Sequence, residues 1–223
     1  MSDAIRVGLV GFGYASKTFH APLIGGTPGM ALKAVASSDA DKVHADWPGV
    51  KVMSAPGDLL DDPDIDLVVI ATPNDTHFPL AKAALEAGKH VVVDKPFTVT
   101  LSQARELESL AKHCGRILSV FHNRRWDSDF LTVSALINEG QLGEVCYFES
   151  HFDRFRPQVR QRWREQAGPG SGIWYDLAPH LLDQVVVLFG LPVSITVDLA
   201  QLRPGAQSTD YFHAVLAYPQ RRV

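Results

Sequence analysis

Short, almost continuously apolar runs recur along the first half of the chain and alternate with stretches of helical periodicity. The runs lie at 5–10, 32–36, 67–71, 90–93 and 116–121. Strands that alternate with helices predict βαβ units and a parallel sheet. Apolar residues at every position, instead of every second one, are typical of a sheet covered by helices on both faces. We therefore predict a doubly wound α/β domain.

Three helices are predicted between these strands, at 17–24, 80–87 and 101–113. Thr100 stands three residues before Gln103, which is the spacing of a capping box. Gly88 and Gly115 follow the last two helices, and glycine commonly ends a helix. The ends of these two helices are therefore well marked.

The pattern changes after Phe121. Helices are predicted at 127–139 and 175–189, and strands at 145–152, 193–199 and 211–218. These long, widely spaced strands predict an open, mainly antiparallel sheet in a second α/β domain. We place the domains at 1–122 and 123–223. Because the sequence ends directly after a strand, we expect the second domain to be incomplete.

Composition narrows the class of ligand. The apolar share of 46% is ordinary for a globular protein, and the net charge of −4 gives no attraction for nucleic acid or an anionic membrane. The apolar runs are far shorter than the roughly 20 residues of a membrane-spanning helix. The N-terminus lacks a secretory signal, and Cys114 and Cys146 have no metal or redox spacing. We expect a cytoplasmic protein with a small-molecule ligand.

A glycine motif follows the first strand, with the sequence Gly11-Phe12-Gly13-Tyr14-Ala15-Ser16. Gly11 permits a tight turn, and Gly13 lets the backbone approach a pyrophosphate at the start of a helix. Ser16 occupies the third glycine position, and an ordinary βα turn is the alternative. The motif predicts dinucleotide binding.

The end of the second strand indicates which dinucleotide is bound. NAD-specific sites carry an acidic residue there to bind the ribose 2′-hydroxyl, whereas this chain has Ser37 and Ser38. Two hydroxyls do not repel a 2′-phosphate, so NADP(H) is preferred and NAD(H) remains possible. Asp39 and Asp41 are close enough to reach the ribose, although Ser38 or Asp39 is equally suited to cap the next helix.

Two further motifs stand where strands end, at the edge where open α/β sheets bind ligands. The first, after the strand at 67–71, contains Thr72, Pro73, Asn74 and His77. The second is Asp94-Lys95-Pro96. A lysine at this edge can stabilise a developing alkoxide, although a single lysine is also an ordinary loop residue.

The predicted helix at 175–189 carries Asp176, His180 and Asp183 at i, i+4 and i+7, which places them on one face. Histidine can take a proton from an alcohol near neutral pH, and a carboxylate one turn away can orient it. A metal site is the alternative, but no second cluster of ligands is evident, so we predict no metal.

Together these segments resemble the Gfo/Idh/MocA oxidoreductase family in order and spacing, over nearly the whole chain. The segments 18–23 and 121–126 most resemble the NADP-dependent scyllo-inositol dehydrogenases of that family. Asp94 stands where the family usually has glutamate, which keeps the charge and shortens the reach.

The resemblance implies a Rossmann domain followed by a domain that binds substrate and mediates homo-oligomerisation, as a dimer or tetramer. It implies a catalytic set of Lys95, Asp176 and His180, with His180 as general base. It also implies cofactor contacts from Asn123, Trp163 and Arg164. The expected reaction interconverts a secondary alcohol and a ketone of a polyol, cyclitol or sugar. A non-catalytic dinucleotide-binding regulator and an NAD-retaining glycosidase are the alternatives.

Overall fold

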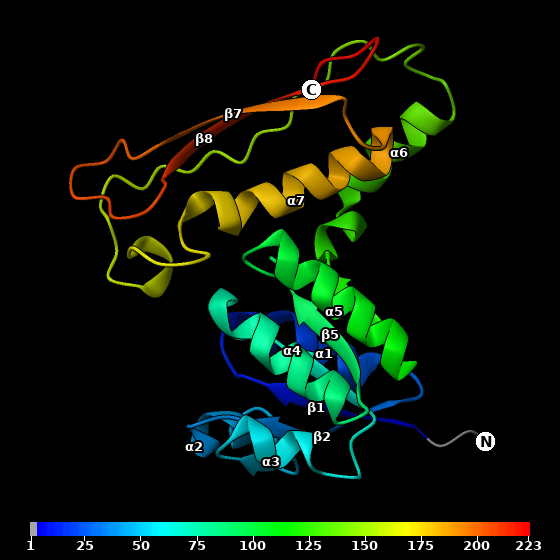
Figure 1. Cartoon of the computed structure of the whole chain (residues 1–223), viewed down its shortest axis with the longest axis vertical. Helices are drawn as coiled ribbons and strands as arrows, with labels where there is room; N and C mark the ends of the chain where they lie inside the picture. The colour runs from blue at the N-terminus through cyan, green and yellow to red at the C-terminus, as the bar shows by residue number, and fades with distance from the viewer. Residues whose placement is uncertain (1–3) are drawn as a thin grey trace. The chain divides into compact units, whose positions relative to one another are not determined.

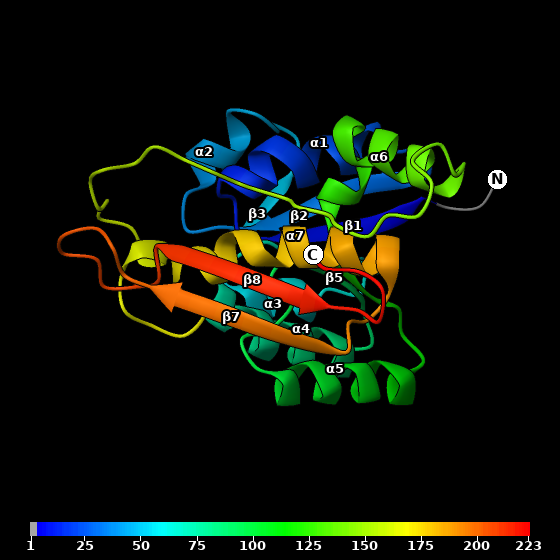
Figure 2. The same ribbon diagram turned by 90° about the horizontal axis from the view of Figure 1, so that it is seen from above.

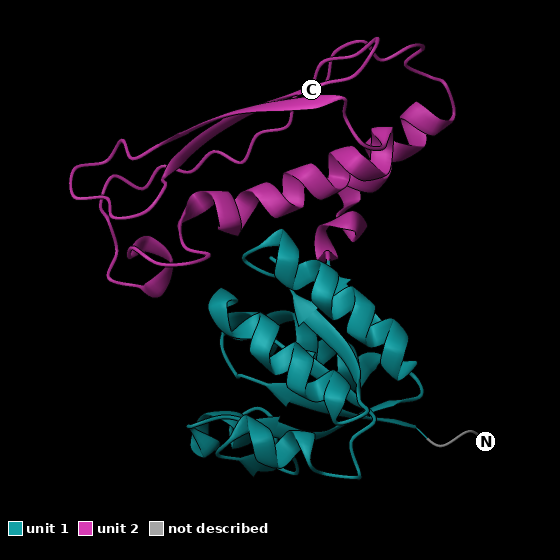
Figure 3. Cartoon of the chain, viewed as in Figure 1, with its two compact units in different colours: residues 1–121 teal, residues 122–223 magenta. Residues whose placement is uncertain are grey.

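The computed structural model describes residues 4–223, and the chain forms two compact units, Met1–Phe121 and His122–Val223 (Figure 3). The first unit is built on a six-stranded parallel sheet in the order β3-β2-β1-β4-β5-β6. Figure 1 labels β1, β2 and β5 of this sheet. Its strands are β1 (Ile5–Val10), β2 (Met30–Ala36), β3 (Lys51–Met53), β4 (Leu67–Ile70), β5 (His90–Asp94) and β6 (Leu118–Phe121). The order reverses between the neighbouring strands β1 and β4, which is the Rossmann arrangement.

Helices cover both faces of this sheet, because apolar residues of β1 point to both faces. Val7 and Leu9 pack with a helical segment on one face, and Val10 packs with a second group of helices on the other. The first face carries the π-helical turn η1 (Ser16–His20), α1 (Ala21–Gly26) and α2 (Ala40–His44). The second carries α3 (Pro56–Leu60), α4 (His77–Glu86), preceded by the turn η2 (Asn74–Thr76), and α5 (Leu101–Cys114).

The predicted parallel sheet is confirmed, and so is the helix-capping pattern. The Thr100 hydroxyl accepts a hydrogen bond from the Gln103 amide at 3.3 Å, and Gly115 ends α5 with a φ of 62°. The prediction for α4 was wrong by one turn, because the helix begins at His77 and not at residue 80. The short elements β3, α2 and α3 were not predicted.

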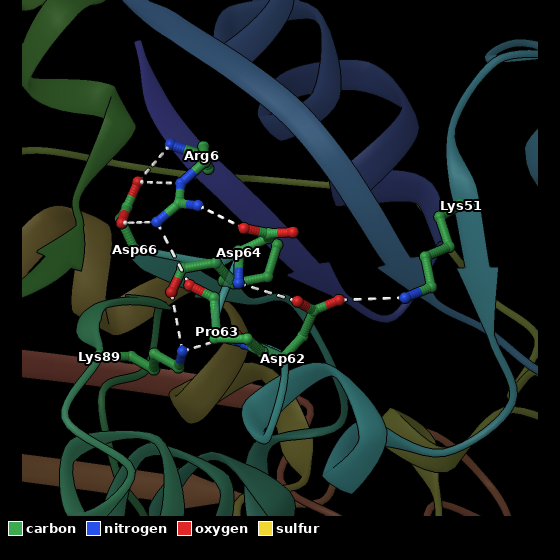
Figure 4. A network of polar contacts seen from close by, with 8 residues as sticks. Arg6, Lys51, Asp62, Pro63, Asp64, Asp66 and Lys89 are labelled. Carbon is green, nitrogen blue, oxygen red and sulfur yellow. Dashed lines mark hydrogen bonds and ion pairs between the residues drawn. The ribbon is translucent and has the colours of Figure 1, made fainter. Parts of the chain in front are cut away.

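Charged residues join the amino ends of β1 and β4, at the edge of the sheet opposite the strands' carboxyl ends (Figure 4). The Arg6 guanidinium donates to both carboxylate oxygens of Asp66, at 3.0 and 2.8 Å, and also to Asp64 at 2.7 Å. Lys89 donates to the carbonyls of Asp62 and Ile65. Hydrogen bonds from the Arg6 side chain and backbone lower the pKa of Asp66 to about 2.

Replacing Asp66 with asparagine is expected to destabilise the chain at neutral pH and to flatten its response to acid. A depressed carboxyl pKa contributes stability that is present above the unfolded value and is lost as the pH falls through the folded value. The window therefore runs from about pH 4 down to about pH 2. Both side chains are more than a third exposed, so we expect a loss of only about 1 kcal/mol. Urea denaturation across this window measures the loss.

Asp64→Asn is the matched control, because the Asp64 side chain is 81% exposed and contacts only one arm of the same guanidinium. It is expected to change the free energy of unfolding by a few tenths of a kcal/mol at most. Equal losses in the two variants would contradict a special role for Asp66.

The second unit combines helices with an antiparallel hairpin. Its elements are the turn η3 (Asn123–Trp126), α6 (Ser128–Asn138), the turn η4 (Trp163–Glu165), α7 (Gly172–Phe189), β7 (Ser194–Ala200) and β8 (Tyr211–Ala217). The hairpin lies along α7 (Figure 2), and Val185 of the helix packs with Leu216 and Tyr218. The predicted antiparallel pairing is confirmed. The helix α7 begins three residues earlier than predicted, at Gly172.

The predicted strand at 145–152 is wrong. Only Tyr147 forms a bridge, with Arg222, supported by hydrogen bonds from the Phe148 and Arg222 amides. A strand requires a partner along its length, and the segment 149–152 has none among residues 4–223.

Among residues 4–223, no helix is long and apolar enough to cross a membrane.

Candidate functional site

A cavity of about 460 Å³ opens in the first unit where the strands end. Residues from the carboxyl ends of four neighbouring strands line it: Gly11 and Gly13 after β1, Ser37 after β2, Ser54 after β3 and Thr72 after β4. This edge includes the point at which the strand order reverses, which is where ligands bind in open α/β sheets. The cavity therefore collects the glycine motif and the serines from separate parts of the sequence.

Gly11 has a φ of +88°, and a Cβ there would lie 2.7 Å from the carbonyl oxygen of Ala71. Only glycine suits this conformation and this approach of backbone to backbone. The Ser16 hydroxyl donates to the Gly11 carbonyl at 2.8 Å and is fully buried. The serine at the third glycine position therefore stabilises the turn.

Gly13 differs from Gly11 because it is exposed and a Cβ there would meet no atom within 4 Å. Helical backbone begins directly after it, at Tyr14, and continues through η1 and α1. Amide groups at the start of a helix attract anions. Open space beside this start fits the pyrophosphate of a dinucleotide. The Phe12 side chain is buried and Tyr14 is exposed, so Phe12 can offer such a ligand only its backbone.

Ser37 and Ser38 line the cavity together with Lys42. The sequence pattern did not reveal that Lys42 belongs to this wall. Lys42 lies in the first turn of α2, and its amide donates to the Asp39 carboxylate at 3.0 Å. Asp39 is thus the N-cap of α2, as one of the two interpretations of the sequence proposed. The cavity wall at this point contains two hydroxyls, an ammonium group and the Asp39 carboxylate, which is engaged by the amide of Lys42.

His77 does not face a ligand. Its ring is fully buried, with Nδ1 2.8 Å from the Pro96 carbonyl oxygen and Nε2 3.0 Å from that of Thr72. The ring links the loop after β4 to the loop after β5, and a hydrogen bond of 2.6 Å between the hydroxyls of Thr72 and Thr76 tightens the first loop. His77 is fully buried, so it presents no exposed atom for the predicted contact with a cofactor. Asn74 is likewise buried, whereas Pro73 is exposed.

Asp94 organises the backbone at Lys95, where the Lys95–Pro96 bond is cis. Its carboxylate accepts a hydrogen bond from the Lys95 amide at 2.7 Å, and the buried His20 ring places Nε2 3.7 Å from the other oxygen. Burial raises the pKa of Asp94, but His20 and Lys95 together outweigh it and hold the pKa below its ordinary value. Asp94 is therefore a charged group that fixes the loop bearing Lys95.

In the second unit, Asp176 lies between two arginines. Its carboxylate is 3.7 Å from Arg154 Nη1 and 3.5 Å from Arg164 Nε. The Arg164 guanidinium also stacks 4.4 Å above the ring of Trp163. His180, one turn further along α7, is only 7% exposed and meets the ring of Phe152 edge-on.

Asp183 is bound elsewhere, since Arg125 donates to both of its carboxylate oxygens, at 2.7 and 2.6 Å. Asp176 and Asp183, which were predicted to share one face of α7 with His180, therefore pair with different arginines. Asn123 begins η3, two residues after β6 ends. Across residues 4–223, no three His, Cys, Asp or Glu side chains are grouped so that they could hold a metal ion.

Two profiles of one oxidoreductase family match the chain. Residues 5–122 match the Gfo/Idh/MocA oxidoreductase family, NAD-binding Rossmann fold, and residues 134–223 match the C-terminal alpha/beta domain of the same family. The two matches cover both units.

Individual relatives agree with these matches. The chain is 80% identical over its whole length to the uncharacterized oxidoreductase YdgJ of Escherichia coli K12, covering 64% of that protein. It is 39% identical to the scyllo-inositol 2-dehydrogenase (NADP(+)) IolW of Bacillus subtilis, over 97% of the chain and 60% of IolW. The YPO2259 structure from Yersinia pestis superposes with a TM-score of 0.93 at 70% identity, over 100% of this chain and 63% of that one. The chain thus spans somewhat under two thirds of the length of these relatives.

Proposed function

The chain belongs to the Gfo/Idh/MocA oxidoreductase family, and from this membership we propose that it is part of an NADP(H)-preferring dehydrogenase or reductase. The enzyme interconverts a secondary alcohol and a ketone of a cyclitol or sugar. Residues 1–122 bind the dinucleotide, and residues 123–223 begin the domain that binds substrate and joins subunits into a dimer or tetramer. The observation that carries the proposal is the cavity beside Gly11 and Gly13 at the carboxyl ends of the strands.

The residues present fit a dinucleotide. Gly13 leaves open space at the start of a helix, where backbone amides favour a pyrophosphate. Ser37, Ser38 and Lys42 suit a ribose 2′-phosphate, which needs hydrogen-bond donors and a positive charge. When bound, the cofactor supplies the hydride acceptor or donor.

The remaining assignments concern the substrate's hydroxyl group. His180 takes the hydroxyl proton as general base during oxidation and returns it during reduction. Lys95 donates a hydrogen bond to the same oxygen and stabilises its developing negative charge. Asp176 accepts a hydrogen bond from the substrate and orients it, with its carboxylate held by Arg154 and Arg164. Asn123, Trp163 and Arg164 complete the cofactor contacts. IolW, which acts on scyllo-inositol, supports a cyclitol or sugar as substrate.

The test of the proposal is a fluorescence titration of the chain with NADPH and with NADH, together with a Lys42→Gln variant. NADPH is expected to bind more tightly than NADH. Because the ammonium group of Lys42 would pair with the 2′-phosphate alone, Lys42→Gln should weaken NADPH binding about tenfold and leave NADH binding unchanged.

Lys33→Gln is the matched control, since Lys33 is exposed on β2 and does not line the cavity. It should bind both nucleotides as the parent chain does. Failure of the parent chain to bind either nucleotide would overturn the proposed function. Equal weakening of NADPH and NADH binding by Lys42→Gln would refute only the pairing of Lys42 with the 2′-phosphate. The proposed function itself would stand.

A further inference from the structure

A second cavity, of about 300 Å³, lies wholly within the second unit and is unusually rich in arginine. Segments far apart in the sequence form it: the loop before η4, η4 itself, the start of α7 and the loop before β8. Asp176, which we propose as a substrate-binding residue, lines it. The charged side chains of its wall are Arg154, Arg156, Arg162, Arg164, Arg203, Glu165, Asp176 and Asp210.

Most of these charges neutralise one another. Glu165 pairs with Arg162 at 2.8 Å and with Arg203 at 3.2 Å, and Arg203 also pairs with Asp210 at 2.9 Å. Asp176 lies between Arg154 and Arg164. The five arginines nevertheless outnumber the three carboxylates, which leaves the wall two positive charges in excess.

Arg156 accounts for much of this excess. Within residues 4–223, its guanidinium makes no hydrogen bond or ion pair with another side chain. Burial lowers the pKa of Arg156, and so do the positive charges of Arg154, Arg160 and Arg162, whereas the negative charge of Asp176 raises it to a lesser extent. A guanidinium stays protonated in proteins, so these side chains repel one another until an anion enters.

We propose that this cavity binds an anionic group of the substrate, a carboxylate or a phosphate, and that Arg156 is its principal ligand. This inference rests on the proposed function, because it places the anionic group next to Asp176. Arginine suits the task, since its planar fork matches the two oxygens of a carboxylate or phosphate. The substrate is then an acidic or phosphorylated sugar or cyclitol, and not a neutral one.

Calorimetric titration of the chain with three probes tests the inference: glucuronate, glucose 6-phosphate and neutral glucose. At least one anionic probe is expected to bind about tenfold more tightly than glucose, and the stronger of the two identifies the anionic group. Arg156→Gln should remove this advantage with little change in melting temperature, because no hydrogen bond or close ion pair joins the guanidinium to another side chain among residues 4–223 and only the weaker attraction of Asp176 is lost. Arg160→Gln is the matched control, since it removes the same charge from the same loop, but Arg160 lines a different cavity.

NADPH titration of the same samples separates the two proposals. If NADPH binds but the anionic probes bind no better than glucose, the anion site is refuted and the proposed function stands. If Arg156→Gln weakens NADPH binding as much as probe binding, the cavity serves a cofactor phosphate and the inference is likewise overturned. If NADPH does not bind while the anionic probes bind with the expected dependence on Arg156, the proposed function fails and the anion site stands.

Discussion

Replacing His180 with alanine is expected to lower kcat about a thousandfold, because a general base in the right place accelerates proton transfer by two to four orders of magnitude. The imidazole lies one turn after Asp176 on α7 and is 7% exposed. The measurement is steady-state oxidation of scyllo-inositol and of acidic sugars by the full-length enzyme, with the pH profile of kcat/KM.

Two controls separate catalysis from folding. His151→Ala removes an exposed histidine of the same unit and should leave kcat unchanged. NADPH affinity of the His180→Ala enzyme should match that of the parent, since His180 does not line the proposed dinucleotide cavity and is not among the proposed cofactor contacts. Partial recovery of turnover with added imidazole would support a role in proton transfer. Full turnover by His180→Ala would exclude His180 as the base.

The parallel sheet could be predicted because its longer strands are buried on both faces and are therefore apolar throughout. The strand β3 escaped prediction since Lys51–Met53 has only three residues, too few for a pattern. The segment 145–152 has the composition of a strand, but pairing depends on a partner that composition does not specify. The local sequence pattern thus identified the elements that bury much surface. It failed where the formation of a strand depends on the partner with which it pairs.

Sequence position alone also could not show where side chains point. His77 stands in a motif at the ligand edge of the sheet, yet its ring turns inward between two loops. Lys42 has no motif of its own and reaches the cavity because α2 begins beside Ser37 and Ser38. Arg156 and Arg203 are 47 residues apart and meet only when the second unit folds. The glycine motif was recognisable because backbone conformation itself demands glycine at Gly11.

The two glycines of this motif are expected to respond oppositely to a methyl group. Gly13→Ala should lower NADPH affinity by about ten- to a hundredfold, the cost of inserting a methyl group into a close contact. A Cβ at Gly13 meets no protein atom within 4 Å, so the variant should unfold at the same urea concentration as the parent. Its methyl group would occupy the space through which we propose that the pyrophosphate reaches the backbone.

Gly11→Ala supplies the contrast. Its φ of +88° and the 2.7 Å approach to the Ala71 carbonyl strain any other residue, so this variant should lose about 1–3 kcal/mol of unfolding free energy. Urea denaturation and NADPH titration of both variants measure the two effects separately. If the Gly13→Ala variant bound NADPH as tightly as the parent, the pyrophosphate of the dinucleotide would not contact the backbone at Gly13. Because a methyl group at Gly13 meets no protein atom within 4 Å, a loss of binding at unchanged stability is best explained by the ligand's own need for that space.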